Sequence, residues 1–279
     1  MYRILRKEVL NPTVVRMDIE APAIAAKAQP GQFIILRVDA EGERIPLTIA
    51  DYDRAEGSVS IIFQIVGATT TLLAAKEAGD AIPDFAGPLG RPTDTAGMRK
   101  VAVIGGGVGC AIAYPVAKRL HEEGAVVHTV VGFRNRDLII LQREFEQVSD
   151  EFRLMTDDGS AGQKGLVTDA LRALIEGGER YDAVIAIGPL IMMKFVCKLT
   201  KEFGIKTIVS MNPIMIDGTG MCGGCRLTVG GKTKFACVDG PDFDGHLVDF
   251  DECMARGATY KEFEAHAREE ACRLLHMEQ

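Results

Sequence analysis

Two hydrophobic patterns follow one another along this chain, and each predicts a different architecture. Up to residue 97, short runs of β-branched and apolar residues alternate with turn signals such as Pro30-Gly31. This spacing predicts an antiparallel β barrel or sandwich. A helix is expected at Thr70–Ala78, with Gly79 as its C-cap. The predicted strands are Thr13–Ile19, Gln32–Val38, Ile45–Ala50 and Ser58–Val66.

From Met98 to residue 212, strands alternate with helices, which predicts a doubly wound parallel α/β sheet. The expected strands are Lys100–Gly105, Ala125–Gly132, Phe152–Met155, Ala183–Ile187 and Thr207–Met211. The expected helices are Cys110–Glu123, Leu138–Val148, Leu166–Glu176 and Met192–Phe203.

The regular alternation stops after Pro213. Glycines crowd residues 218–231, which predicts a tightly turning, irregular loop. An amphipathic helix is expected at Thr259–His276. The chain therefore divides into segments 1–97, 98–212, 213–250 and 251–279.

Composition and charge narrow the class of protein. Of 279 residues, 47% are apolar and 25% are charged, which is typical of a globular protein large enough for two domains. The net charge of −7 argues against nucleic-acid binding, which needs clustered Lys and Arg. No apolar run approaches the roughly 20 residues of a membrane span, and the N-terminus lacks a secretory signal. We therefore expect a cytoplasmic protein.

A glycine-rich turn begins the α/β domain. In VIGGGVGCAIAYPVAK, residues 103–118, the turn follows a strand and starts a helix, where backbone N–H groups can hold a pyrophosphate. Gly105 and Gly107 suit a tight turn and close approach, with Val108 next to them. Gly109 comes one place early for a strict G-x-G-x-x-G. This context favours a dinucleotide site over a structural loop.

The residues after the second strand of this domain bear on the choice of dinucleotide. The usual ribose-binding acid is missing, and GFRNRDLI (132–139) offers Arg134 and Arg136 instead. Two arginines can cradle a 2′-phosphate or pair with a pyrophosphate, and a solvated loop paired with Asp137 is the alternative. The sequence is compatible with either NADH or NADPH as the dinucleotide cofactor.

Two segments of the first domain are candidate flavin contacts. On the strand Arg44-Ile45-Pro46-Leu47-Thr48, the Arg and Thr can meet a phosphate and a flavin ring edge. Gly67, followed by Thr69, Thr70 and Thr71 at a helix start, is a candidate diphosphate seat. Taken alone, either segment can also be an ordinary barrel strand or helix cap.

The strongest signal is a cysteine cluster. Cys222, Cys225 and Cys237 lie in IDGTGMCGGCRLTVGGKTKFACVDG, residues 216–240. Clustered cysteines in a cytosolic chain indicate metal or redox chemistry. With Asp217 in the first position, the set reproduces the C-x4-C-x2-C…C spacing of a plant-type [2Fe–2S] centre. A structural zinc site and a chance grouping are the alternatives.

Taken in order, these elements resemble the ferredoxin–NADP reductase superfamily, over essentially the whole chain. The cluster loop places the resemblance in its iron–sulfur flavoprotein branch, which includes small subunits of NADH-dependent ferredoxin:NADP oxidoreductases (sulfide dehydrogenase β subunits) and, less closely, dihydroorotate dehydrogenase electron-transfer subunits. The segments that carry it are ERIPLTIAD (43–51), GPLG (87–90), VIGGGVG (103–109), GFRNRDL (132–138) and DGTGMCGGCR (217–226).

The resemblance implies a flavin-binding barrel at 1–97, an NAD(P)-binding domain at 98–212, a [2Fe–2S] segment at 213–250 and a C-terminal helix. Arg44, Pro46 and Thr48 would meet the flavin of FAD, and Gly67–Thr71 its diphosphate. Gly105–Gly109 and Gly188-Pro189 would line the NAD(H) site, with NADP(H) not excluded. Asp217 stands where dihydroorotate-type subunits have Cys, and this favours the bifurcating branch.

The implied function is electron transfer between NADH, FAD and the cluster. A larger partner subunit with a second flavin and [4Fe–4S] clusters is implied, where ferredoxin and NADP react. The alternative is that the chain is the electron-transfer subunit of a dihydroorotate or sulfide dehydrogenase. A zinc-bearing nucleotide-binding module without redox activity is the third hypothesis.

Overall fold

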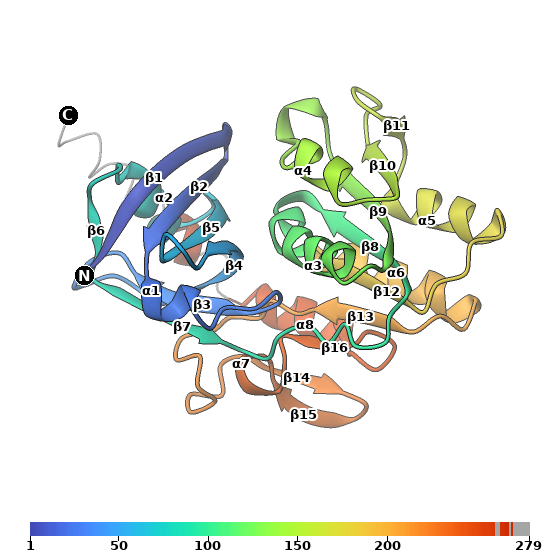
Figure 1. The fold of residues 1–279 in the computed structure, drawn as a ribbon. Helices are drawn as coiled ribbons and strands as arrows, with labels where there is room; N and C mark the ends of the chain where they lie inside the picture. The colour runs from blue at the N-terminus through green and yellow to red at the C-terminus, as the bar shows by residue number, and fades with distance from the viewer. Residues whose placement is uncertain (260–262, 268, 270–279) are drawn as a thin grey trace.

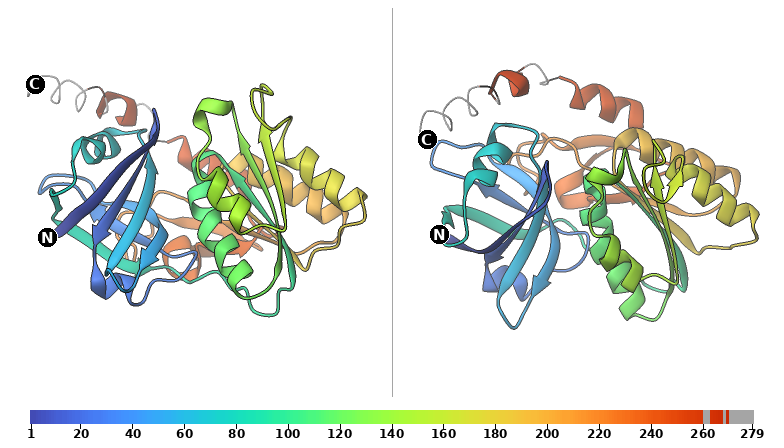
Figure 2. Two further views of the ribbon diagram at one scale, coloured as in Figure 1. Left: turned by 45° about the horizontal axis from the view of Figure 1, so that its top comes forward. Right: turned by 90° about the horizontal axis from the view of Figure 1, so that it is seen from above.

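The chain folds as two bodies with a third segment that runs against both of them (Figures 1 and 2). The computed structural model describes residues 1–259, 263–267 and 269. The helix predicted at Thr259–His276 lies mostly outside these residues. Among the helices that are described, none is both long and apolar enough to cross a membrane.

The N-terminal body is the predicted antiparallel barrel. Its seven strands follow the order β6-β1-β2-β5-β4-β3-β7. Side chains alternate across each strand, so that Met17, Ile34 and Ile61 are fully buried in the interior. The elements are β1 (Tyr2–Asn11), β2 (Val14–Glu20), α1 (Pro22–Ala25), β3 (Phe33–Arg37), β4 (Ile45–Asp53), β5 (Ser58–Gln64), α2 (Ala68–Ala75), β6 (Ala81–Ile82) and β7 (Asp84–Leu89).

The second body is the predicted α/β domain. Its sheet order is β11-β10-β9-β8-β12-β13-β16, parallel except for the edge strand β16. Strand β8 is buried on both faces because helices cover the sheet on each side (Figure 1). The elements are β8 (Lys100–Gly106), η1 (Gly107–Gly109), α3 (Cys110–Glu122), β9 (Val126–Phe133), η2 (Arg136–Leu138), α4 (Gln142–Gln147), β10 (Glu151–Thr156), β11 (Gln163–Lys164), α5 (Val167–Glu176), β12 (Ala183–Ile187), α6 (Leu190–Glu202) and β13 (Thr207–Ser210).

One predicted helix of this domain is shorter than expected. In place of Leu138–Val148, the structure has η2 and then α4, separated by Leu141 at φ +56°. An apolar residue in the left-handed region cannot continue a right-handed helix, so α4 begins only after it.

The segment after Pro213 is more regular than predicted. It contains β14 (Arg226–Val229), β15 (Lys232–Phe235), α7 (Ala236–Asp239), β16 (Asp242–Asp244) and α8 (Phe250–Gly257). Gly230 and Gly231 have φ +58° and +73° and form the two-residue turn of the β14–β15 hairpin. Such a turn needs positive φ at both positions, so these glycines mark a hairpin and not an irregular loop.

The linker between the two bodies lies along the end of this C-terminal segment. Arg91 N donates to Gly240 O at 2.7 Å, and Thr93 Oγ1 donates to Asp242 Oδ2 at 2.6 Å. The other oxygen of Asp242 is buried without a hydrogen-bond partner among the described residues. Burial therefore raises the pKa of Asp242 to about 6, although the hydroxyls of Thr93 and Ser210 act in the opposite direction.

Candidate functional site

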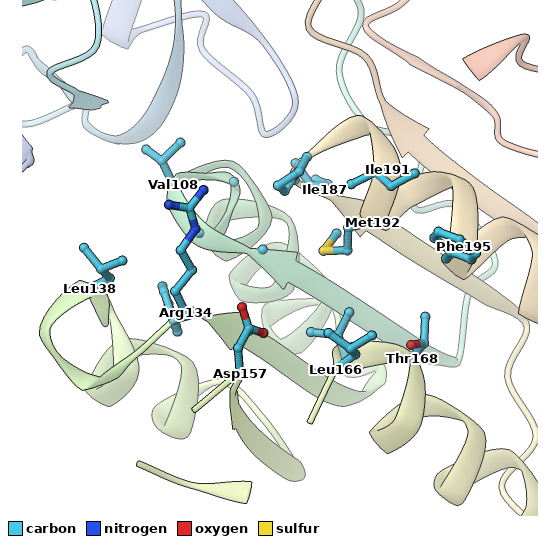
Figure 3. Close-up of a pocket in the computed structure, with 18 of the residues that line it drawn as sticks. Val108, Arg134, Leu138, Asp157, Leu166, Thr168, Ile187, Ile191, Met192 and Phe195 are labelled. Carbon is cyan, nitrogen blue, oxygen red and sulfur yellow. The ribbon is translucent and has the colours of Figure 1, made fainter. Parts of the chain in front are cut away.

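A cavity of about 880 Å³ lies at the carboxyl ends of the parallel strands (Figure 3). This volume is within the range of small-molecule and cofactor sites. Strand order reverses beside β8, because β9 to β11 continue on one side and β12 and β13 on the other. Ligands of open α/β sheets bind at such a switch point. The barrel contributes Asn11, Thr13, Val14 and Gln64, so the cavity lies between the two bodies.

The glycine-rich turn forms one wall, and its glycines have different roles. Gly107 has φ +54°, and a Cβ placed on it would meet no atom within 4 Å, so a ligand can approach its backbone closely. A Cβ on Gly109 would lie 2.6 Å from the backbone of Gly188. Gly105 packs against the Cys110 thiol and does not line the cavity. Gly109 is therefore the glycine that permits close packing on β12.

Three helices begin at the cavity. The lining includes η1 with Val108 just before α3, Gly188 and Pro189 just before α6, and residues 165–169 at the start of α5. The N-terminal end of a helix carries free N–H groups and a partial positive charge. This edge of the sheet therefore suits a dianionic pyrophosphate.

The two candidate arginines behave differently. Arg134 follows β9 and lines the cavity, where its side chain extends toward Val108 (Figure 3). Arg136 lies in η2, its backbone N–H bonds to Ser160 Oγ at 2.8 Å, and it is absent from the cavity lining. Asp157, which follows β10, also lines the cavity, and the next residue, Asp158, donates its N–H to Arg134 O at 3.3 Å. Sequence reasoning missed the Asp157 carboxylate because it looked for an acid only after β9.

Apolar side chains at the cavity mouth were also missed. Leu166, Ile191 and Phe195 line the cavity and are 58%, 49% and 52% exposed (Figure 3). Ile191 and Phe195 are four residues apart on α6, whose other face buries Met193 and Val196. The sequence could have indicated this surface, because Ile191 and Phe195 are spaced i,i+4 on the side of α6 opposite its buried residues. An exposed apolar surface of this kind suits a planar ring of a ligand.

The candidate flavin strand points its polar residues outward. All five residues are partly buried, but Ile45 and Leu47 pack against the barrel core, and Arg44, Pro46 and Thr48 alternate with them along the chain. The strand thus presents an arginine, a flat proline and a hydroxyl on one face, which fits a flavin edge. The Leu47 side chain is directed away from that face.

The candidate diphosphate seat lies beside this strand. Thr69 Oγ1 donates to Glu43 Oε2 at 3.3 Å, which joins the start of α2 to the start of β4. Gly67, the N-cap of α2, faces open space, so its backbone is accessible. The hydroxyls of Thr70 and Thr71 instead donate to Gly67 O, at 3.0 and 2.9 Å. The backbone of this turn, more than its hydroxyls, can receive a phosphate.

The four candidate metal ligands form two pairs. The Cys225 thiol lies 3.2 Å from Cys237 Sγ, and both residues are buried. Cys222 is exposed and lies close enough to Asp217 for the two to interact electrostatically. No group of three or more His, Cys, Asp or Glu able to hold a metal ion is found within the described part of the chain.

Local hydrogen bonds prepare the Asp217–Cys222 pair to carry negative charge. The Asp217 carboxylate accepts from Thr219 Oγ1 at 2.6 Å and from the Thr219 and Met221 N–H groups, and with a contribution from Arg44 these lower its pKa. The Gly224 N–H, 3.4 Å from Cys222 Sγ, is the main group that lowers the pKa of that thiol.

The buried pair behaves in the opposite way. Burial and the Cys225 contact raise the pKa of Cys237 to about 12, so the Cys237 thiol stays protonated until a metal replaces its proton. Two sulfurs on one tetrahedral metal lie about 3.7 Å apart, given bonds of about 2.3 Å. The Cys225–Cys237 spacing is near this value, and two ligand pairs fit a centre of two irons.

Two family models match separate parts of the chain. Residues 103–198 match an oxidoreductase NAD-binding domain, and residues 212–249 match the iron–sulfur cluster binding domain of dihydroorotate dehydrogenase B. The second match favours the iron–sulfur interpretation of the cysteines over zinc.

Full-length relatives and solved structures extend the comparison. An electron transfer subunit homolog of dihydroorotate dehydrogenase B (NAD(+)) from Thermotoga maritima is 48% identical over 95% of this chain and 93% of its own length. The corresponding subunit from Streptococcus pneumoniae is 34% identical over 86% of this chain and 94% of its own. A chain of an NADH-dependent reduced ferredoxin-NADP oxidoreductase structure, studied for flavin-based electron bifurcation, is 45% identical, with TM-score 0.92 and 97% coverage of both chains.

The barrel, the α/β sheet and the cavity between them define an oxidoreductase of the ferredoxin–NADP reductase fold. The chain belongs to the family of dihydroorotate dehydrogenase B electron-transfer subunits and their homologues. Membership assigns it FAD, an iron–sulfur cluster and NAD(H) as cofactors.

Proposed function

We propose that the chain passes electrons from NADH through FAD to a [2Fe–2S] cluster, as the small subunit of a bifurcating NADH-dependent ferredoxin:NADP oxidoreductase. The observation that carries the proposal is the hydrogen bond from Arg44 Nε, directly before strand β4, to Ile216 O at 3.0 Å, directly before the candidate ligand Asp217. It holds the candidate cluster loop against the candidate flavin face, and short cofactor separations are what electron transfer needs.

NADH would occupy the cavity between the two bodies. Gly107 and the helix starts would receive its pyrophosphate, and Leu166, Ile191 and Phe195 would flank the adenine. We favour NADH over NADPH because the Asp157 carboxylate can accept hydrogen bonds from ribose hydroxyls and repels a 2′-phosphate. Arg134 then pairs with the pyrophosphate.

FAD would lie on the outward face of β4, held by Arg44, Pro46 and Thr48, with its diphosphate at Gly67 and the start of α2. Bound there, FAD supplies the conversion of a two-electron hydride transfer into single-electron steps. The chain itself positions the two cofactors, and no side-chain acid or base is required, so we assign no catalytic residue.

The cluster would be held by Asp217, Cys222, Cys225 and Cys237. Local hydrogen bonds lower the pKa of Asp217 and of Cys222, which favours their charged, metal-binding forms, whereas the raised pKa of Cys237 means that this thiol releases a proton when metal binds. The carboxylate ligand and the 45% identical chain from the bifurcating enzyme both favour the bifurcating assignment.

The larger partner would carry a second flavin and [4Fe–4S] clusters, and ferredoxin and NADP would react there, in the cytoplasm. A dihydroorotate dehydrogenase electron-transfer subunit is the second candidate, favoured by the family of its iron–sulfur segment and by its relatives.

The test is an anaerobic visible spectrum of the purified chain, with FAD, iron, acid-labile sulfide and zinc assayed on one sample. About one FAD and about two irons per chain support the proposal. Zinc in place of iron would refute the cluster. Copurification with the partner subunit then decides between functions, because ferredoxin- and NADP-dependent NADH turnover supports the first candidate and dihydroorotate oxidation the second.

A further inference from the structure

An arginine from the barrel side fastens each end of the segment that carries the candidate cluster ligands. Arg44 Nε donates to Ile216 O at 3.0 Å, directly before Asp217. Arg91 Nε donates to Val238 O at 3.0 Å, directly after Cys237. The two carbonyls therefore bracket the whole ligand set, from its first member to its last.

Packing supports the same attachment. A Cβ on Gly218 would lie 2.9 Å from the side chains of both Ile35 and Leu89, so the start of the loop lies directly on strands β3 and β7. The middle of the loop is different, because Met221 is 87% exposed and Cys222 is also exposed. The loop is thus held at its ends and open at its centre.

We propose that Arg44 and Arg91 are positioning residues that clamp the cluster segment onto the flavin barrel and place two positive charges beside its ligands. The proposal rests on the proposed [2Fe–2S] function. The hydrogen bonds of both arginines go to backbone carbonyls next to the candidate ligands, so each arginine acts through that backbone and through its charge.

Two consequences follow from charge and geometry. The cluster gains one negative charge on reduction, so a nearby guanidinium stabilises the reduced form more than the oxidised form. Removing that charge lowers the reduction potential. Removing the side-chain hydrogen bond of Arg91 loosens this end of the segment at Val238, although the backbone bond from Arg91 N to Gly240 O remains, and nearby amides then exchange with solvent faster.

Arg91→Gln is the informative variant, because Arg91 lies outside the candidate flavin and nucleotide sites. Arg54→Gln is the matched control, since Arg54 Nη2 also donates to a barrel carbonyl, Ala28 O at 3.1 Å, far along the chain from the cluster segment. Arg91→Lys keeps the positive charge but not the guanidinium geometry, so it separates the effect of charge from that of the hydrogen bond. It also replaces Arg91→Gln in the experiment if that variant does not fold.

The first measurement is hydrogen exchange of residues 216–225 and 236–240 in the full chain after iron removal. We expect Arg91→Gln to speed exchange about fivefold, the factor for one hydrogen bond of ordinary net strength, and Arg54→Gln to leave it unchanged. The second is a redox titration of the loaded chain by electron paramagnetic resonance. We expect a lower cluster potential in Arg91→Gln and a potential close to wild type in Arg91→Lys.

Exchange and potential equal to those of Arg54→Gln would overturn the clamp. Absence of any cluster from the wild-type chain would instead refute the proposed function, and the exchange measurement would still decide whether the clamp exists.

Discussion

Replacing Asp242 with Asn should stabilise the protein at neutral pH. The Asp242 carboxylate is buried between the linker and β13, with one oxygen unpartnered among the described residues and the other on the Thr93 hydroxyl. Asn has the same shape and mimics the protonated acid, so the variant removes the buried charge and little else.

The size and sign of the effect follow from the pKa of Asp242, about 6 against an ordinary 3.8. Between these values the folded protein binds a proton that the unfolded chain does not, so stability falls as pH rises from about 4 to 6 and then levels off. A difference of about two pKa units corresponds to about 3 kcal/mol. Asp242→Asn does not lose stability in this way, so the difference in unfolding free energy between the variant and the wild type should be greatest above pH 7.

The assay is urea unfolding of both proteins from about pH 4 to pH 8, compared as the difference in unfolding free energy at each pH. Asp244→Asn, an exposed carboxylate on the same strand, is the control. A wild-type–variant difference that does not grow with pH would show that Asp242 is not held protonated by burial.

Three further predictions concern the site. Gly109→Ala should lower both the melting temperature and the NADH affinity, because the added Cβ would overlap the β12 backbone. Gly107→Ala should lower NADH affinity about tenfold with a smaller loss of stability, because only its positive φ is strained. Thermal melts and NADH titrations distinguish the two variants. Asp157→Ser should raise NADPH affinity relative to NADH, and an unchanged ratio in competition titrations would contradict its proposed role. Cys225→Ala should lose iron while Cys253→Ala, a buried cysteine outside the ligand set, keeps it, as measured by iron and sulfide content.

The strand–turn–helix units could be predicted because each depends on neighbouring residues alone. The buried run of β8, the glycine turn and α3 are contiguous, and Ala183–Ile187 was predicted with the bounds it has. The hairpin around Gly230 was missed because a crowd of glycines masks a turn that needs two of them in succession.

The cavity could be predicted only in part, because residues from distant elements build it. Gly107 and Arg134 follow strands in recognisable patterns, but Asp157, Leu166 and Phe195 come together only when β10, α5 and α6 pack on the sheet. The sequence likewise placed Arg44 on a strand as a candidate flavin contact. Its bond to Ile216, 172 positions later, required the folded chain.

The attachment of the cluster segment to the barrel constrains how the protein is made. Ile35 and Leu89 lie in the first third of the chain, and Gly218, which covers them, is among the last quarter to leave the ribosome. N-terminal domains fold during synthesis, so the barrel forms while this apolar surface is still bare. Chains that stop before residue 218 would therefore carry a folded barrel with an exposed apolar surface prone to aggregation, and the cluster could be inserted only after Cys237 has been synthesised.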